Sequence, residues 1–170
     1  MNAPGTSSRL IRWILAAPAV FVVHDGEELL TIVPWLRAHR AALPDIMQPL
    51  ADVTTPQLAL AMLVLLGGLA VAAIHGVHRA RQGRRSLLFL VLAGALVGNG
   101  LTHLGQALLF RGYTPGLITA LLVVLPYGYG LGRELRAHRM LSPRAWVGFV
   151  ALGIALQIPI IVGTLLLARG

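Results

Sequence analysis

Three of the six acidic residues of the chain stand together in an otherwise apolar stretch of sequence. Asp25, Glu27 and Glu28 follow His24 within five positions, and they interrupt the apolar run from about residue 10 to residue 35. An α-helix turns by 100° per residue, so it would place His24, Glu27 and Glu28 on one face, with Asp25 at its edge. Carboxyl and imidazole groups that share a face can exchange protons or bind a divalent metal ion.

A second polar face is predicted in the apolar stretch from about residue 86 to residue 110. Its members are spaced as one helix face requires: Asn99, Thr102, His103 and Gln106. If the two helices run parallel, His24 and Asn99 lie at depths that differ by about 3 Å. We therefore expect the two faces to meet, with His24 near Asn99 and Glu28 near His103.

Two chemistries suit this donor set, and the sequence leaves both open. In the first, His24, Glu27, Glu28 and His103 bind a divalent metal, and Asn99 orients a ligand by an outer hydrogen bond. Imidazole and carboxylate ligands without thiolate favour Zn²⁺, Fe²⁺ or Mn²⁺. In the second, a glutamate keeps its proton and acts as a general acid, with a histidine as its partner.

The composition indicates the kind of structure that must position these groups. The chain has 170 residues, 56% of them hydrophobic and 12% charged, with a mean hydropathy of +0.77. Soluble domains carry roughly 25% charged residues, so an ordinary soluble protein is excluded, and so is a disordered chain. There is no cysteine, which excludes disulfides and thiolate metal sites. We expect an all-α, polytopic transmembrane bundle that forms a single membrane-embedded domain.

Five apolar segments are long enough for spans of about 20 residues each. They cover approximately residues 10–35, 57–78, 86–110, 115–135 and 145–168. Because the acidic cluster interrupts the first segment, a cleaved signal peptide and a re-entrant hairpin are alternatives to a full span there. We favour the full span, with its polar face turned toward the bundle.

The basic residues indicate topology rather than nucleic-acid binding. All fourteen are arginine, and they fall between the apolar segments instead of forming a basic patch interleaved with aromatic residues. Ten of them lie on the cytoplasmic side if the N-terminus is cytoplasmic and the C-terminus is outside, and four lie on the opposite side. The positive-inside rule favours this orientation.

Other polar residues stay open as members of the site. Gln157, Tyr127 and Tyr129 are expected at a similar depth and could complete a polar ring. His75 and His78 lie near the inner end of their segment, beside Arg79, and are expected to be interfacial.

The stretch His24-Asp25-Gly26-Glu27-Glu28 reads H-x-x-E-E and resembles the signature of the HXXEE-domain family of small prokaryotic membrane proteins. The similarity continues with Asn99, His103 and the stretch from Arg111 to Gly116, which reads R-G-Y-T-P-G. The resemblance implies a multi-pass protein of the bacterial cell membrane. It strengthens the choice of site residues and supplies no reaction.

Ionisable groups at bilayer depth cost roughly 2.5–3.5 kcal/mol each, so they are expected to serve a function. The sequence favours an enzyme that acts on a lipid-soluble substrate, of lipid or isoprenoid-like type, by metal-assisted or acid–base catalysis. A proton-coupled small transporter or a ligand-binding membrane protein is the alternative. The substrate, the reaction type and the oligomeric state do not follow from the sequence.

Overall fold

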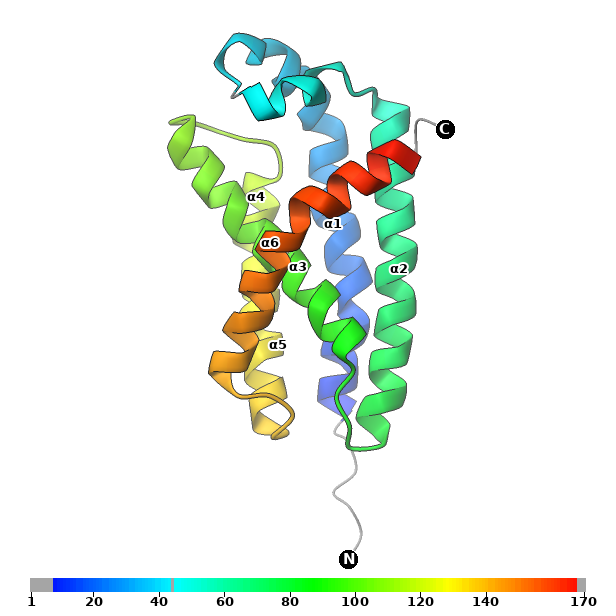
Figure 1. Cartoon of the computed structure of the whole chain (residues 1–170). Coiled ribbons are helices and arrows are strands. Elements are labelled where there is room, and N and C mark those ends of the chain that lie inside the picture. The colour runs from blue at the N-terminus through cyan, green and yellow to red at the C-terminus, as the bar shows by residue number, and fades with distance from the viewer. Residues whose placement is uncertain (1–7, 44, 168–170) are drawn as a thin grey trace, which may run out of the picture.

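The computed structural model describes residues 8–43 and 45–167, and all regular elements in this part are helical (Figure 1). Four long segments are single helices: α1 (Ser8–Ala38), α2 (Thr55–Arg81), α3 (Leu87–Leu109) and α6 (Pro143–Leu167). Another long segment, between α3 and α6, is a continuous run of α4 (Leu117–Thr119), the π-helical turn η3 (Ala120–Val124) and α5 (Leu125–Ala137). Two short 3₁₀ helices, η1 (Arg40–Ala42) and η2 (Asp45–Asp52), lie between α1 and α2. The all-α prediction is confirmed, and the five segments match the predicted ranges within a few residues. The predicted end of the fifth segment, Ala168, lies outside the described residues.

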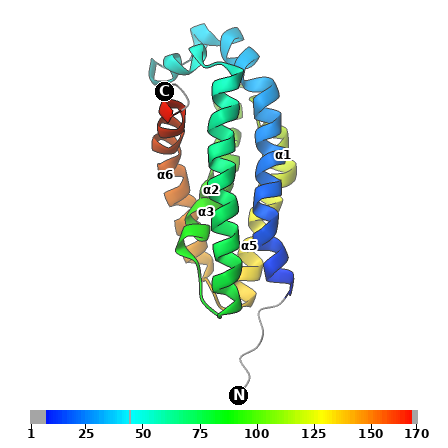
Figure 2. The same ribbon diagram turned by 90° about the vertical axis from the view of Figure 1, so that its right-hand side faces the viewer.

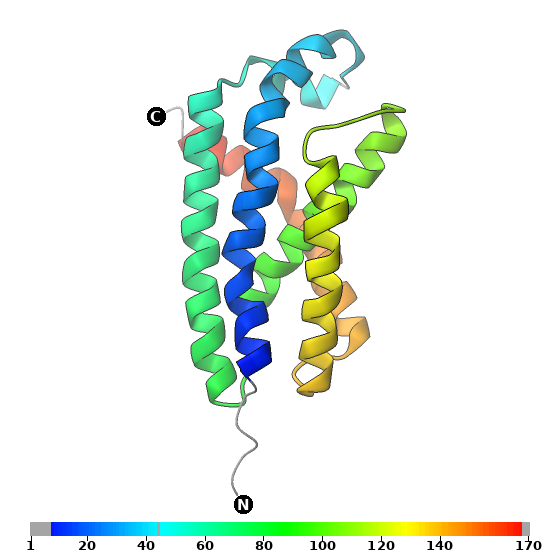
Figure 3. The same ribbon diagram turned by 180° about the vertical axis from the view of Figure 1, so that it is seen from behind.

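The long segments alternate in direction along the bundle (Figure 1). α1 and α2 lie side by side, and the run from α4 to α5 lies on the other side of α1 (Figures 2 and 3). α3 is tilted across these helices and packs most extensively against α6. α1 and α3 therefore run in the same sense but share few close backbone contacts.

Local sequence signals explain where the central helices begin and end. The hydroxyl of Ser86 accepts a hydrogen bond from the backbone N–H of Phe89 at 3.1 Å, which caps the start of α3. The side chain of Gln57 accepts a hydrogen bond from the backbone N–H of Thr54 at 3.1 Å, at the start of α2. Gly83, with φ +68°, allows the tight turn that joins the two helices.

α1 continues through the acidic cluster without a break. This continuity excludes the re-entrant hairpin that the interrupted hydropathy left open. One face of its first half is fully buried, at Leu10, Ile14 and Ala17, and packs into the main hydrophobic core. That core occupies the end of the bundle at which α1 begins, and it holds the helices in place below the acidic cluster.

Two helices in the described part are long and apolar enough to cross a membrane. They are α2 and α3, with mean hydropathies of 2.4 and 1.8 over their most apolar stretches. α1 and α5 carry charged groups within their lengths, such as Glu27 and Glu28 in α1 and Glu134 in α5, which lower their hydropathy. By length and composition, the structure thus supports membrane association through two candidate spans.

Candidate functional site

His24 lies in the middle of α1 and is completely buried. Its Nε2 atom lies 3.0 Å from the amide nitrogen of Asn99, and its Nδ1 atom lies 2.8 Å from the hydroxyl oxygen of Thr119. An amide nitrogen can only donate, so Nε2 accepts this hydrogen bond and the ring proton resides on Nδ1. The lone pair of Nε2 therefore points toward α3.

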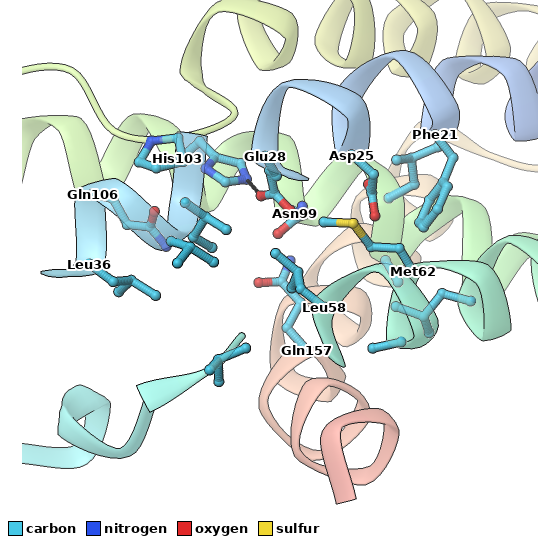
Figure 4. A pocket seen from close by; sticks show the side chains of 18 of the residues that line it. Phe21, Asp25, Glu28, Leu36, Leu58, Met62, Asn99, His103, Gln106 and Gln157 are labelled. Atoms are coloured by element: carbon cyan, nitrogen blue, oxygen red, sulfur yellow. Dashed lines mark ion pairs between the residues drawn. The ribbon is translucent and has the colours of Figure 1, made fainter. Parts of the chain in front are cut away.

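Glu28, one turn further along α1, approaches His103 of α3. Its Oε1 atom lies 2.8 Å from His103 Nε2, and the two side chains are only 14% and 5% exposed (Figure 4). Within the described part of the chain, neither ring nitrogen of His103 has the geometry of a hydrogen bond. The contact is therefore close without being a hydrogen bond, and both ring nitrogens of His103 remain without a hydrogen-bond partner in this part of the chain.

The two histidine rings stand edge to face, with their centroids 4.9 Å apart and an interplanar angle of 80°. His24, Glu28 and His103 each offer one ligand atom, and these three atoms lie within 4.8 Å of one another. Two imidazoles and one carboxylate at this spacing can hold a divalent metal while leaving coordination positions open. We refer to these three residues as the His–Glu centre.

The structure brings together three of the four ligands predicted from the sequence, and Glu27, the fourth, is not part of the His–Glu centre. Consecutive helix positions differ by 100°, so Glu27 and Glu28 lie on opposite sides of His24. The Glu27 carboxylate accepts hydrogen bonds from the backbone N–H and the hydroxyl of Thr119, at 2.7 and 2.6 Å. It also accepts bonds from the backbone N–H of Ile118 at 3.3 Å and the phenol of Tyr113 at 2.8 Å.

These contacts form a hydrogen-bonded relay behind His24. The Thr119 hydroxyl donates to Glu27 and accepts the Nδ1 proton of His24, so the carboxylate fixes the imidazole tautomer through one threonine. Desolvation raises the pKa of the Tyr113 phenol above its ordinary value, which keeps the phenol protonated as a donor to Glu27. Thr119 carries no sequence signal, whereas Tyr113 belongs to the R-G-Y-T-P-G stretch.

The loop between α3 and α4 covers both imidazoles. Gly116 has φ +81°, a left-handed conformation that favours glycine. A Cβ atom there would lie 2.8 Å from His103 Cε1 and 3.0 Å from His24 Cε1. Thr114, two positions before Gly116, is fully buried. Only glycine lets this loop pack directly on the two rings.

A cavity of about 260 Å³ adjoins the centre between α1, α2, α3 and α6. Its polar lining comes from three helices: Asp25 and Glu28 of α1, Asn99, His103 and Gln106 of α3, and Gln157 of α6 (Figure 4). The contribution of α2 is entirely apolar and includes Leu58, Met62 and Leu65. A largely apolar cavity with a few convergent polar groups is typical of a small-molecule site.

Gln157 is the only one of the three undecided residues that reaches this cavity; its Oε1 atom accepts a hydrogen bond from Thr102 at 3.2 Å. Tyr127 packs against Trp13 instead, and Tyr129 is 74% exposed. His75 bonds Ser86 at the opposite end of the bundle.

His78 lies close to Gln82, at the same end as His75.

The sequence places Asp25 only at the edge of the polar face of α1. The structure makes it a buried lining residue of the cavity, 8% exposed.

Fold and site together define an all-α bundle with a buried His–Glu centre beside an apolar cavity. A sequence model of the family described as "Protein of unknown function with HXXEE motif" matches residues 15–130. The chain belongs to this HXXEE family, as its motif residues indicated. The matched range includes most of α1, all of α3 and the loop that covers the His–Glu centre. No curated protein and no solved structure matches the chain.

Proposed function

We propose that this protein is an integral membrane enzyme that acts on a lipid-soluble substrate, with a divalent metal held by His24, Glu28 and His103. The observation that carries the proposal is the position of the three ligand atoms, within 4.8 Å of one another at the wall of the cavity. The polar centre and the apolar cavity thus adjoin, so one bound molecule can contact both.

The ligand types favour Zn²⁺, Fe²⁺ or Mn²⁺. A divalent ion held by His24, Glu28 and His103 would supply Lewis-acid chemistry at the wall of the cavity. The protein contributes the orientation of the ligands: Thr119 fixes the His24 ring through Nδ1, and Gly116 lets the covering loop pack over both imidazoles. Nε2 of His24 would then bind the metal in place of its hydrogen bond from Asn99. The surrounding apolar residues limit the access of water to the site.

Metal stoichiometry tests this proposal directly. The full chain is purified in detergent without chelator, and its metal content is measured by elemental analysis. We expect about one equivalent of divalent metal per chain, released by EDTA. Glu28→Gln and His103→Ala should lose most of it, whereas the control His75→Ala should retain it, because His75 bonds Ser86 far from the centre.

The same preparation distinguishes metal-assisted catalysis from acid–base catalysis. The 2.8 Å contact between Glu28 and His103 supports the acid–base alternative. If the protein contains far less than one equivalent of metal and still binds its substrate fully in EDTA, the proposed metal site is wrong. Acid–base catalysis by Glu28 and His103 then remains. Mass spectrometry of co-purified lipid tests the cavity: a bound apolar molecule that is lost in a Met62→Trp variant supports the proposal. Wild-type protein that never carries or binds such a molecule contradicts it.

We further propose that all five long helical segments cross the membrane, with the N-terminus cytoplasmic and the C-terminus outside, in a bacterial inner membrane. The alternating direction of the segments and the positions of the arginines support this orientation. A membrane-embedded bundle also accounts for exposed apolar side chains along the outer faces of the helices. Examples are Leu63 and Ile74 of α2 and Leu108 of α3.

A further inference from the structure

One carboxyl group of the cavity, that of Asp25, has no partner among the residues that the structure describes. It is 8% exposed, and no hydrogen bond or ion pair joins it to any residue in the described ranges. The neighbouring Glu28 is occupied by His103, and Glu27 is occupied by Thr119. The Asp25 carboxyl group is therefore available to accept a hydrogen bond from a molecule in the cavity.

A donor without a partner faces the same cavity from another helix. Gln157 of α6 accepts a hydrogen bond from Thr102 through Oε1, but its buried Nε2 atom has no acceptor among the described residues. Figure 4 shows Asp25 and Gln157 on different walls of the cavity. The cavity therefore presents at least one unused acceptor and one unused donor within a mostly apolar lining.

The charges of the lining constrain the head group that such a molecule can carry. Asp25 and Glu28 are the acidic lining residues, and no arginine contributes to the lining in the described part of the chain. The lining offers no cationic side chain to pair with an anionic head group, and the divalent metal of the proposed function disfavours a cationic one. A neutral head group therefore fits best.

We propose that the cavity binds a lipid-soluble alcohol, whose hydroxyl donates a hydrogen bond to Asp25 and accepts one from Gln157, directly or through a water molecule. A hydroxyl is a small neutral group that both donates and accepts. Its hydrocarbon part lies against the apolar wall of α2, at Leu58 and Met62. This inference rests on the proposed function and specifies the substrate class of the same site.

The test measures the head-group preference of the metal-loaded full chain in lipid nanodiscs. Decane, decanol, decylamine and decanoic acid each compete with a fluorescent apolar dye, and their concentrations are expressed as mole fractions in the bilayer. Decanol should bind at least about tenfold more tightly than decane, as two hydrogen bonds to buried polar groups allow, and more tightly than the amine or the acid.

Asp25→Leu and Gln157→Leu should each reduce decanol binding by about tenfold while leaving decane binding unchanged. Because decane reports an intact cavity, this pattern separates a lost hydrogen bond from a misfolded protein, and the two variants test the two bonds independently. The control Asp45→Leu removes an exposed carboxylate outside the cavity and should change neither affinity.

Three results would overturn the inference. The first is equal binding of decane and decanol to the wild-type chain, or decanol binding that neither cavity variant changes. Either outcome shows that the cavity does not select an alcohol, and it leaves the proposed function intact. Tighter binding of decylamine than of decanol shows a negatively charged cavity and excludes the neutral head group. If none of the four compounds displaces the dye, the apolar substrate of the proposed function fails, and the inference fails with it.

Discussion

At the scale of single residues, the site depends on how His24 is held. Its two ring nitrogens are bonded differently, with Asn99 on one side and Thr119 backed by Glu27 on the other. In metal sites, an outer hydrogen bond of this kind orients the imidazole and raises its basicity. Thr119 is therefore a positioning residue for His24, and it would act on the proposed metal through that ring without touching the ion.

Substitution of Thr119 tests this role. Thr119→Val keeps the shape of the side chain but removes the hydroxyl, so metal affinity should fall by about 10–100-fold. Thr119→Ser restores the hydroxyl and should keep affinity near the wild-type value. Competition with a metal-binding dye measures both constants. Equal affinities of the valine and serine variants would show that the relay has no effect on the metal.

Gly116 is the second residue whose identity the geometry requires. Gly116→Ala places a Cβ atom against both imidazoles in a backbone conformation that disfavours any side chain. We expect the free energy of unfolding to fall by about 1–3 kcal/mol and metal affinity to fall with it. Thermal unfolding in detergent measures the first effect.

Gly105→Ala is the matched control for Gly116→Ala. Gly105 lies within α3 with open space around its Cα, so an added methyl group should leave stability unchanged or slightly raise it. If the two alanine variants are equally stable, the loop does not pack on the histidines as described.

At the scale of helices, periodicity predicted the meeting of α1 and α3 at the site but not the way the helices reach each other. The contacts from His24 to Asn99 and from Glu28 to His103 follow from spacing and depth alone, and both are present. The sequence could not show which side of His24 faces α3, because that depends on the rotation of α1 within the bundle. Glu27 was therefore grouped with the ligands.

The partners of Glu27 could not be predicted, because Thr119 and Tyr113 are brought to α1 by tertiary packing of the covering loop. Helix periodicity carries no information about such loops. The structural role of Asp25 was missed for a related reason. It lies three positions before Glu28, a spacing that places both on the cavity side, but the cavity exists only because α2 and α6 enclose it.

The tilt of α3 also has a local cause in its contact with α6. A Cβ atom at Gly94 would meet the backbone carbonyl of Phe149, and one at Gly153 would meet the backbone of Ala95. The two helices thus approach closely through small residues, a mode of packing that is common between membrane helices. This close approach positions the part of α3 that carries Asn99 and His103.

Widening the α3–α6 contact should therefore disturb the site from a distance. Gly94→Val forces the backbones apart and should lower the free energy of unfolding by about 1–3 kcal/mol. Metal affinity should also fall, since α3 carries His103. Gly148→Ala, on a part of α6 with open space, is the control and should leave both quantities unchanged. Unfolding curves and metal titrations of both variants check this prediction.

At the scale of the whole molecule, the two ends of the bundle differ in charge. The arginines between α2 and α3, those around the end of α5, and those at the start of α1 all belong to the end where the chain begins (Figure 1). Arg37, Arg40 and Arg111 belong to the opposite end, near the cavity, and Arg169 lies outside the described residues. The arginine-rich end is also stabilised by an ion pair from Arg9 to the buried Glu134, at 2.9 Å.

The unequal distribution of arginines between the two ends predicts how the bundle is oriented in the membrane. If the arginine-rich end faces the cytoplasm, reporter fusions after residues 40, 82, 112, 140 and 170 should alternate, beginning on the outside. Alkaline phosphatase should be active at 40, 112 and 170, and a cytoplasmic fluorescent protein should be active at 82 and 140. Phosphatase activity at 82 or 140 would contradict the orientation. If the same reporter is active at two successive positions, the segment between them does not cross the membrane. The fusions at 112 and 140 apply this test to the run from α4 to α5. Its charged C-terminal half, which includes Arg133 and Glu134, makes it the most demanding segment to insert.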